Sequence, residues 1–250
     1  METLTILLLP TLLMLARISA FFAVLPIFSW RALPRMVRAS IALAVTAFFL
    51  VVRPVGIAPG PIPWMAAVVM VIQEVTWGLA FGLVLRLVYV SIEQGGRIAE
   101  RQMGTADAGV IDPVTGQQGQ AMGTFFDITF TLLFLIAGGH HLFVRFLDGT
   151  FDAFPLGSTP DTAAMARGMV AAGAAMLEFA LKLAAPVLTA FLLLAVVLAI
   201  LARVLPEMNI LLASFPLRVG MGLFIAAAVL PTLHAFTGEI ADWMKRFLMS

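Results

Sequence analysis

The chain has 250 residues, of which 62% are hydrophobic and only 12% are charged. A soluble domain of this size could not bury so much apolar surface, so the composition indicates an integral membrane protein. The net charge of +1 gives no electrostatic basis for binding nucleic acid, and the absence of cysteine excludes disulfides, thiolate metal sites and cysteine nucleophiles.

About six apolar segments are long enough to cross a membrane as helices. They cover residues 4–28, 36–52, 64–93, 124–147, 163–202 and 210–236. Prolines lie inside or beside most of them: Pro10, Pro26, Pro186, Pro216 and Pro231. Because a proline inside a helix removes a backbone hydrogen bond and clashes with the preceding turn, the sequence predicts kinked or broken helices. The expected fold class is an all-α integral membrane protein with about six long, Pro-interrupted helices.

The stretch from Glu93 to Gly123 interrupts this apolar pattern. It begins with charged residues, continues with glycine, glutamine and small residues, and contains an Asp112-Pro113 turn. Non-helical backbone is tolerated at membrane depth only where protein or water surrounds it. The stretch is therefore either an ordinary solvated loop or an element that lines or closes a passage.

Charged side chains also occur inside the apolar segments, where a charge near the membrane centre costs about 2.5–3.5 kcal/mol or more. They include Arg17, Glu74, Asp127, Glu178 and Lys182. Glu178 and Lys182 are four residues apart on one helix face and can pair with each other. The other three have no partner nearby in the sequence, so each is expected to find one on another helix, on another subunit or in water. We interpret all five as polar contacts between helices or between subunits.

The sequence contains no constellation of catalytic residues. Its serines lack a Gly-x-Ser-x-Gly turn, and its glycines have no phosphate-binding spacing. His140 and His141 point in different directions on a helix, with no carboxylate–histidine set around them. The expectation is a protein that is not an enzyme and that holds no cofactor and no metal.

A series of short motifs resembles the FliR family, the export-gate subunit of the bacterial flagellum. The motifs occur in the family's order over nearly the whole chain. They are the stretch from Arg17 to Ser29, Pro34 with Val37-Arg38, Gln102-Met103-Gly104, Asp112-Pro113-x-x-Gly116, Leu133-Phe134-Leu135 before Gly139-His140, Phe154-Pro155-Leu156-Gly157, and Pro206-x-x-Asn209 before Phe215-Pro216-Leu217. The homologous SctT subunit of type III injectisomes shares this pattern. Two features depart from it, namely the charges of Arg97 and Arg101 and the second histidine, His141.

The resemblance implies an architecture and a set of partners. Residues 1–162 would correspond to a FliP-like helical part and residues 163–250 to a FliQ-like helical hairpin, together forming one structural unit. Proteins of this kind assemble with FliP and FliQ in the inner membrane, within the flagellar basal body, and work beside the FlhB-like export switch protein. Unfolded secreted proteins pass through the assembly, and membrane lipid surrounds it. This implies a non-enzymatic subunit.

The resemblance also assigns two functional segments. The loop at residues 104–119 would plug the pore, with Gly104, Asp107, Gly109, Asp112, Pro113, Gly116 and Gly119 as its characteristic residues. The tip of the hairpin would face the cytoplasm, with Pro206, Glu207 and Asn209 in the turn.

Two alternatives stay open beside the flagellar export gate. One is the homologous injectisome subunit, SctT. The other is a carrier of small solutes with broken helices around a site at the membrane midplane. Such carriers usually show matched discontinuous segments in two halves, and this sequence does not show them.

Overall fold

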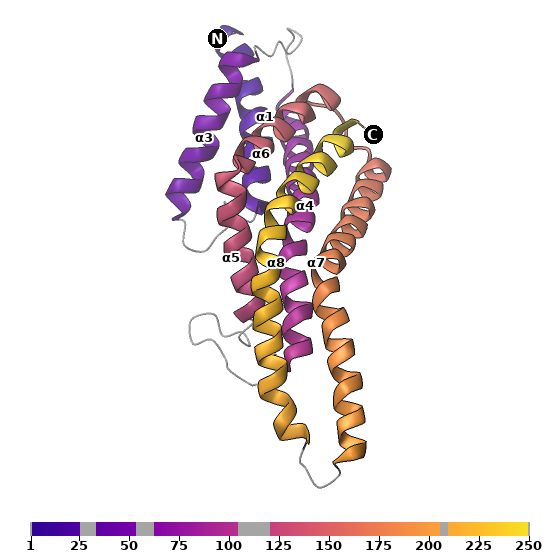
Figure 1. Cartoon of the computed structure of the whole chain (residues 1–250). Coiled ribbons are helices and arrows are strands. Elements are labelled where there is room, and N and C mark those ends of the chain that lie inside the picture. The colour runs from indigo at the N-terminus through magenta and orange to yellow at the C-terminus, as the bar shows by residue number, and fades with distance from the viewer. Residues whose placement is uncertain (1, 26–33, 54–62, 105–120, 206–209, 250) are drawn as a thin grey trace. The chain divides into compact units, whose positions relative to one another are not determined.

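The computed structural model describes residues 2–25, 34–53, 63–104, 121–205 and 210–249 (Figure 1). Within these ranges the chain forms α-helices and the turns that join them, with no strand. The helices are α1 (Glu2–Val24), α3 (Arg35–Val52), α4 (Trp64–Met103), α5 (Ala121–Ile136), α6 (Gly139–Ala153), α7 (Thr162–Val204) and α8 (Ile210–Met249). The predicted all-α membrane fold class is confirmed.

Four of the described helices are long and apolar enough to cross a membrane: α3, α4, α7 and α8. A fifth span results if α5 and α6, which are separated by a short break, are taken together. Helix α4 has 40 residues, so at about 1.5 Å per residue it is far longer than a hydrocarbon core of about 30 Å. A helix of this length must tilt, project from the membrane or be surrounded by protein.

The prolines lie inside continuous helices, whereas a pair of glycines marks a break. Pro186 lies within α7, and Pro216 and Pro231 lie within α8. The apolar segment expected at residues 124–147 forms two helices, α5 and α6, rather than one continuous helix, and the two helices are bent by 75°. Gly138, between the two helices, has a φ of 76°, a left-handed conformation that ends a helix and that glycine adopts without steric cost.

The residues group into two compact units that interleave along the chain. Unit 1 comprises residues 1–89, 140–174 and 242–250, and unit 2 comprises residues 90–139 and 175–241. These units do not test the expected division after residue 162, because that division rests on resemblance to FliP and FliQ and not on compactness within this chain. It stays a prediction.

Within unit 1, glycines on α4 allow it to pack closely against α1, while α3 packs on the other side of α1 (Figure 1). A methyl group on Gly78 would overlap the carbonyl oxygen of Arg17 and would lie 2.9 Å from the Cβ of Ala20. A methyl group on Gly82 would lie 2.9 Å from the carbonyl oxygen of Phe21. Small residues at such contacts let two helix backbones approach, which is how apolar helices gain packing energy without a hydrophobic driving force.

Unit 2 uses glycine contacts in the same way. A methyl group on Gly95 of α4 would lie 2.7 Å from Leu183 Cδ2 on α7, and one on Gly222 of α8 would overlap the side chain of Met103. Gly95 and its neighbour Gly96 therefore do not end α4. Gly95 lies at the surface against which α7 packs.

Candidate functional site

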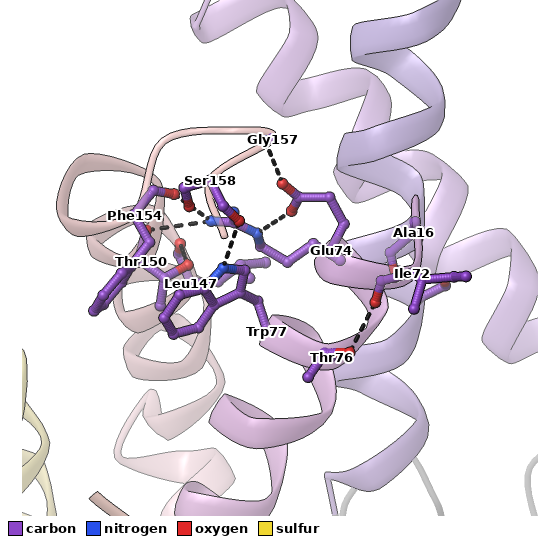
Figure 2. A network of polar contacts seen from close by, with 12 residues as sticks. Ala16, Ile72, Glu74, Thr76, Trp77, Leu147, Thr150, Phe154, Gly157 and Ser158 are labelled. Atoms are coloured by element: carbon purple, nitrogen blue, oxygen red, sulfur yellow. Dashed lines mark hydrogen bonds and ion pairs between the residues drawn. The ribbon is translucent and has the colours of Figure 1, made fainter. Parts of the chain in front are cut away.

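A buried ion pair joins α1 to α4 in unit 1. Arg17 Nε lies 2.5 Å from Glu74 Oε2, and both side chains have a relative exposure of 0%. Figure 2 shows Glu74 reaching from α4 into a group of polar contacts made with the segment around Phe154 and Gly157. We call Arg17, Glu74, Trp77, Thr150, Phe154, Gly157 and Ser158 the Arg17 cluster.

Arg17 Nη1 and Glu74 Oε1 bind backbone groups near the end of α6, whereas Arg17 Nη2 is buried with no hydrogen-bond partner among the described residues. Arg17 Nη1 donates to the carbonyl oxygen of Phe154 at 2.9 Å and to that of Thr150 at 3.3 Å. Glu74 Oε1 accepts a hydrogen bond of 2.7 Å from the backbone N–H of Gly157. The last carbonyls of a helix lack partners within the helix and attract positive charge, so Arg17 satisfies the C-terminal end of α6.

The turn after α6 owes its shape to Gly157. Its φ is 80°, a backbone conformation that glycine adopts readily and other residues rarely do. This conformation presents the Gly157 N–H to Glu74. The sequence motif from Phe154 to Gly157 therefore has a physical reason, because the turn must point one N–H and one carbonyl toward a buried ion pair.

Trp77 completes the cluster on the α4 side. Its Nε1 donates to the carbonyl oxygen of Ser158 at 3.3 Å, as Figure 2 shows. Its ring centroid lies 4.2 Å from that of Phe154 and 5.3 Å from that of Phe81. The cluster thus fastens α1, α4 and the α6–α7 turn to each other. Both carboxylate oxygens of Glu74 are used in this fastening.

In unit 2, Asp127 of α5 lies within electrostatic reach of two charges on α4. It is half-buried and interacts with Glu93 and Arg97. Arg97 forms an ion pair with Glu93, one helical turn away. A methyl group on Gly123 would lie 2.9 Å from Arg97 Cγ, so the start of α5 packs directly on this pair. Sequence reasoning had missed Glu93 and Arg97, although their spacing of four residues is the usual signal for an ion pair on a helix.

Lys182 in unit 2 interacts with two carboxylates. Its Nζ lies 2.9 Å from Glu178 Oε1 on the same helix and 3.5 Å from Glu239 Oε2 on α8. All three side chains are exposed. The structure therefore brings Glu178 and Lys182 together and adds Glu239, which no local pattern connects to them.

An ion pair at the surface of unit 1 was also missed. Arg53, at the C-terminal end of α3, lies 2.7 Å from Asp148 and makes hydrogen bonds of 2.5 and 2.7 Å to the two oxygens of Asp152. The hydrogen bond to Asp152 raises the pKa of Arg53 above its ordinary value. The pairing partners are 95 or more residues away in sequence, so spacing could not have revealed them.

The two functional segments that the resemblance assigned lie almost entirely outside the described residues. Gly104 is described, and it ends α4 with a φ of 75°. Outside lie Asp107, Gly109, Asp112, Pro113, Gly116, Gly119, Pro206, Glu207 and Asn209.

In the described parts of the chain, no group of three or more His, Asp or Glu side chains could hold a metal ion. The ring centroids of His140 and His141 lie 4.1 Å apart. Among the described residues, no Asp, Glu or further His side chain joins them to form a set of metal ligands.

Comparison with known proteins finds similarity to bacterial export proteins. The sequence model of the family "Bacterial export proteins, family 1" matches residues 8–243. The flagellar biosynthetic protein FliR of Escherichia coli is 28% identical over 222 residues, which are 89% of this chain and 84% of that protein. FliR of Bacillus subtilis is 31% identical over 219 residues, covering 84% of this chain and 82% of that protein. The surface presentation of antigens protein SpaR of Shigella sonnei is 25% identical over 162 residues, covering 65% of this chain and 62% of that protein.

Proposed function

Since the chain belongs to the bacterial export proteins of family 1, we propose that it is a non-enzymatic subunit of the flagellar export gate in the bacterial inner membrane. The observation that supports this is the extent of the match, which reaches from residue 8 to residue 243 and includes part of every described helix. The long apolar helices agree with a place in a membrane.

The gate is the assembly through which unfolded flagellar proteins leave the cytoplasm, and its other subunits resemble FliP and FliQ. Helices longer than a bilayer is thick, such as α4 and α7, fit a subunit that other protein surrounds. Their apolar faces would then be covered by neighbouring subunits as well as by lipid. An FlhB-like switch protein would be a further partner, and the hairpin tip at Pro206, Glu207 and Asn209 would contact another export component on the cytoplasmic side.

Within this gate, residues 104–119 are proposed to plug the pore. The proposal rests on the resemblance of the Gly104 and Asp112-Pro113-x-x-Gly116 motifs and on composition. Glycines permit several backbone conformations, and few large apolar side chains are available to anchor the segment in one of them. A weakly anchored segment can leave its closed position at a small cost in free energy.

The relatives favour the flagellar branch over the injectisome branch. Both FliR proteins match more than four fifths of this chain, whereas SpaR matches 65% of it. The injectisome role is the second candidate because SpaR is 25% identical to this chain over 162 residues.

Affinity purification tests the proposed role. The tagged chain, expressed at its native level, is extracted from the membrane in mild detergent, and the proteins that elute with it are identified by mass spectrometry. An unrelated membrane protein with the same tag serves as the control. Enrichment of FliP-like and FliQ-like proteins over the control is expected. Elution of the chain alone, or with the components of a solute carrier, would contradict the proposal.

A further inference from the structure

Unit 1 contains an apolar pocket that the proposed function does not use. Its volume is about 500 Å³, and its walls come from α4, the end of α6, the first turns of α7 and the end of α8. Pockets of about 300–1,000 Å³ with mostly apolar walls are typical of sites for small organic ligands.

Three aromatic rings that pack against one another form one wall of the pocket. Trp77, Phe81 and Phe154 contact one another with centroid separations between 4.2 and 5.6 Å. The Arg17 cluster holds two of these rings in place, because Trp77 donates to Ser158 and the Phe154 carbonyl accepts from Arg17. These contacts fix the positions of two rings that line the pocket.

Small residues on α7 create the space in the pocket. Ala164, Gly168 and Ala171 line it, and their spacing of four and three residues places them on one helix face. Phe247 of α8 lies against this face, where a methyl group on Gly168 would come within 3.0 Å of its ring. A larger side chain at these positions would fill the pocket.

Arg167 is the only charged residue among the described lining residues. Its side chain is exposed and makes no hydrogen bond or ion pair with any other described residue. By contrast, Arg17, Arg53 and Arg97 are each paired with a carboxylate. An unpaired guanidinium at an apolar pocket complements a ligand with an apolar chain and a phosphate group, which arginine binds with two parallel hydrogen bonds.

We propose that the pocket binds one acyl chain of an anionic phospholipid, with Arg167 binding the phosphate. The apolar aromatic wall accepts the chain, and burial of each CH₂ group contributes about 0.8 kcal/mol. Basic pockets between membrane helices are known to bind anionic headgroups. The proposal rests on the membrane character of the chain and on this pocket, and it does not depend on the export role.

Photo-crosslinking in the purified complex tests the proposal. The complex is reconstituted into vesicles that contain phosphatidylglycerol with a photoactivatable acyl chain, or into matched vesicles in which phosphatidylcholine carries the same chain. Crosslinked peptides are then identified by mass spectrometry. Crosslinks to residues 77–84 and 164–171 are expected, with a clear excess for phosphatidylglycerol.

Three variants separate the contribution of the Arg167 charge from that of the apolar space in the pocket. Arg167→Gln should abolish the preference for phosphatidylglycerol. Arg203→Gln, which removes another exposed arginine of α7 that has no ion pair with any described residue, should leave the preference intact. Ala171→Phe should remove crosslinking in the pocket for both lipids. If the Ala171→Phe variant fails to assemble, the lipid preference of the Arg167→Gln variant still tests the proposal. Absence of lipid crosslinks at these peptides, equal crosslinking by both lipids, or crosslinks from these peptides to a protein partner instead would overturn the proposal.

Discussion

Arg17 and Glu74, which are 57 residues apart in the chain, form an ion pair of 2.5 Å that is closed off from solvent. Removing both charges from water costs several kcal/mol, so such a pair adds little net stability over a well-packed apolar pair. Its effect is on geometry. It fixes one register of α1 against α4 and holds the turn at Gly157 against both helices.

Truncating one partner of this pair should be strongly destabilising, because the other charge is left buried and uncompensated. For Glu74→Ala we expect a loss of about 3–5 kcal/mol in the free energy of unfolding. Unfolding of the purified complex by titration with a denaturing detergent measures this loss.

The matched control is Arg53→Gln, which removes a partly exposed ion pair of the same unit. Exposed pairs contribute about 0–1 kcal/mol, so this variant should unfold close to the parent. Equal effects of the two variants would show that the Arg17 cluster does not hold unit 1 together.

The close approach of α4 to α1 gives a second prediction. Gly78→Ala places a methyl group against the Arg17 carbonyl and 2.9 Å from Ala20 Cβ, so the helices must move apart and the ion pair must shift. Overpacking of this kind costs about 1–3 kcal/mol, which a lower thermal unfolding midpoint of the complex would report.

Gly173→Ala is the control for this substitution. No atom lies within 4 Å of a methyl group at Gly173, and replacing a helical glycine by alanine is favourable by up to about 1 kcal/mol. An unfolding midpoint that falls by the same amount for both variants would contradict the close packing of α1 and α4.

The break between α5 and α6 gives a third prediction. Gly138 has a φ of 76°, and a non-glycine residue in this conformation costs about 1–2 kcal/mol. Gly138→Ala should therefore lower the amount of folded protein in the membrane, while Gly220→Ala, at an open position within α8, should not. Membrane levels measured by immunoblot distinguish the two, and unchanged levels for Gly138→Ala would argue that the break does not depend on glycine.

The sequence predicted the fold class because spanning length and low charge are properties of single segments. It failed at residue 138, where the apolar run continued across Gly138 and Gly139 and suggested one helix. At Pro186 the helix α7 continues on both sides of the proline, so a break is absent there and a kink stays a prediction. A long helix supported by neighbours tolerates a missing hydrogen bond, and neighbours are not visible in a local pattern.

For the polar residues, the sequence could tell which ones needed partners but not which partners they had. The contact of Glu178 with Lys182 follows from a spacing of four residues. The contact of Arg17 with Glu74 depends on the packing of α1 against α4, and that of Arg53 with Asp152 on the packing of α3 near α6. Packing of this kind is a tertiary property, so no periodicity in the sequence reveals it.

The plug proposal leads to a further prediction. Deleting residues 104–119 removes few large apolar side chains, and buried apolar area is what stabilises an assembly, at about 25 cal/mol per Å². The complex should therefore still assemble but should conduct ions across reconstituted bilayers at rest. If the deletion variant assembles and conducts no more ions than the parent complex, the seal lies in another part of the gate.

Export of flagellar proteins in the native bacterium tests the central claim most directly. The gene is deleted, and the amounts of hook and filament proteins in the culture medium and in the cytoplasm are measured. The proposed gate role predicts that these proteins disappear from the medium, remain inside the cell, and return to the medium when the wild-type chain is supplied from a plasmid. Unchanged export in the deletion strain, or loss of a different secretion system alone, would contradict it.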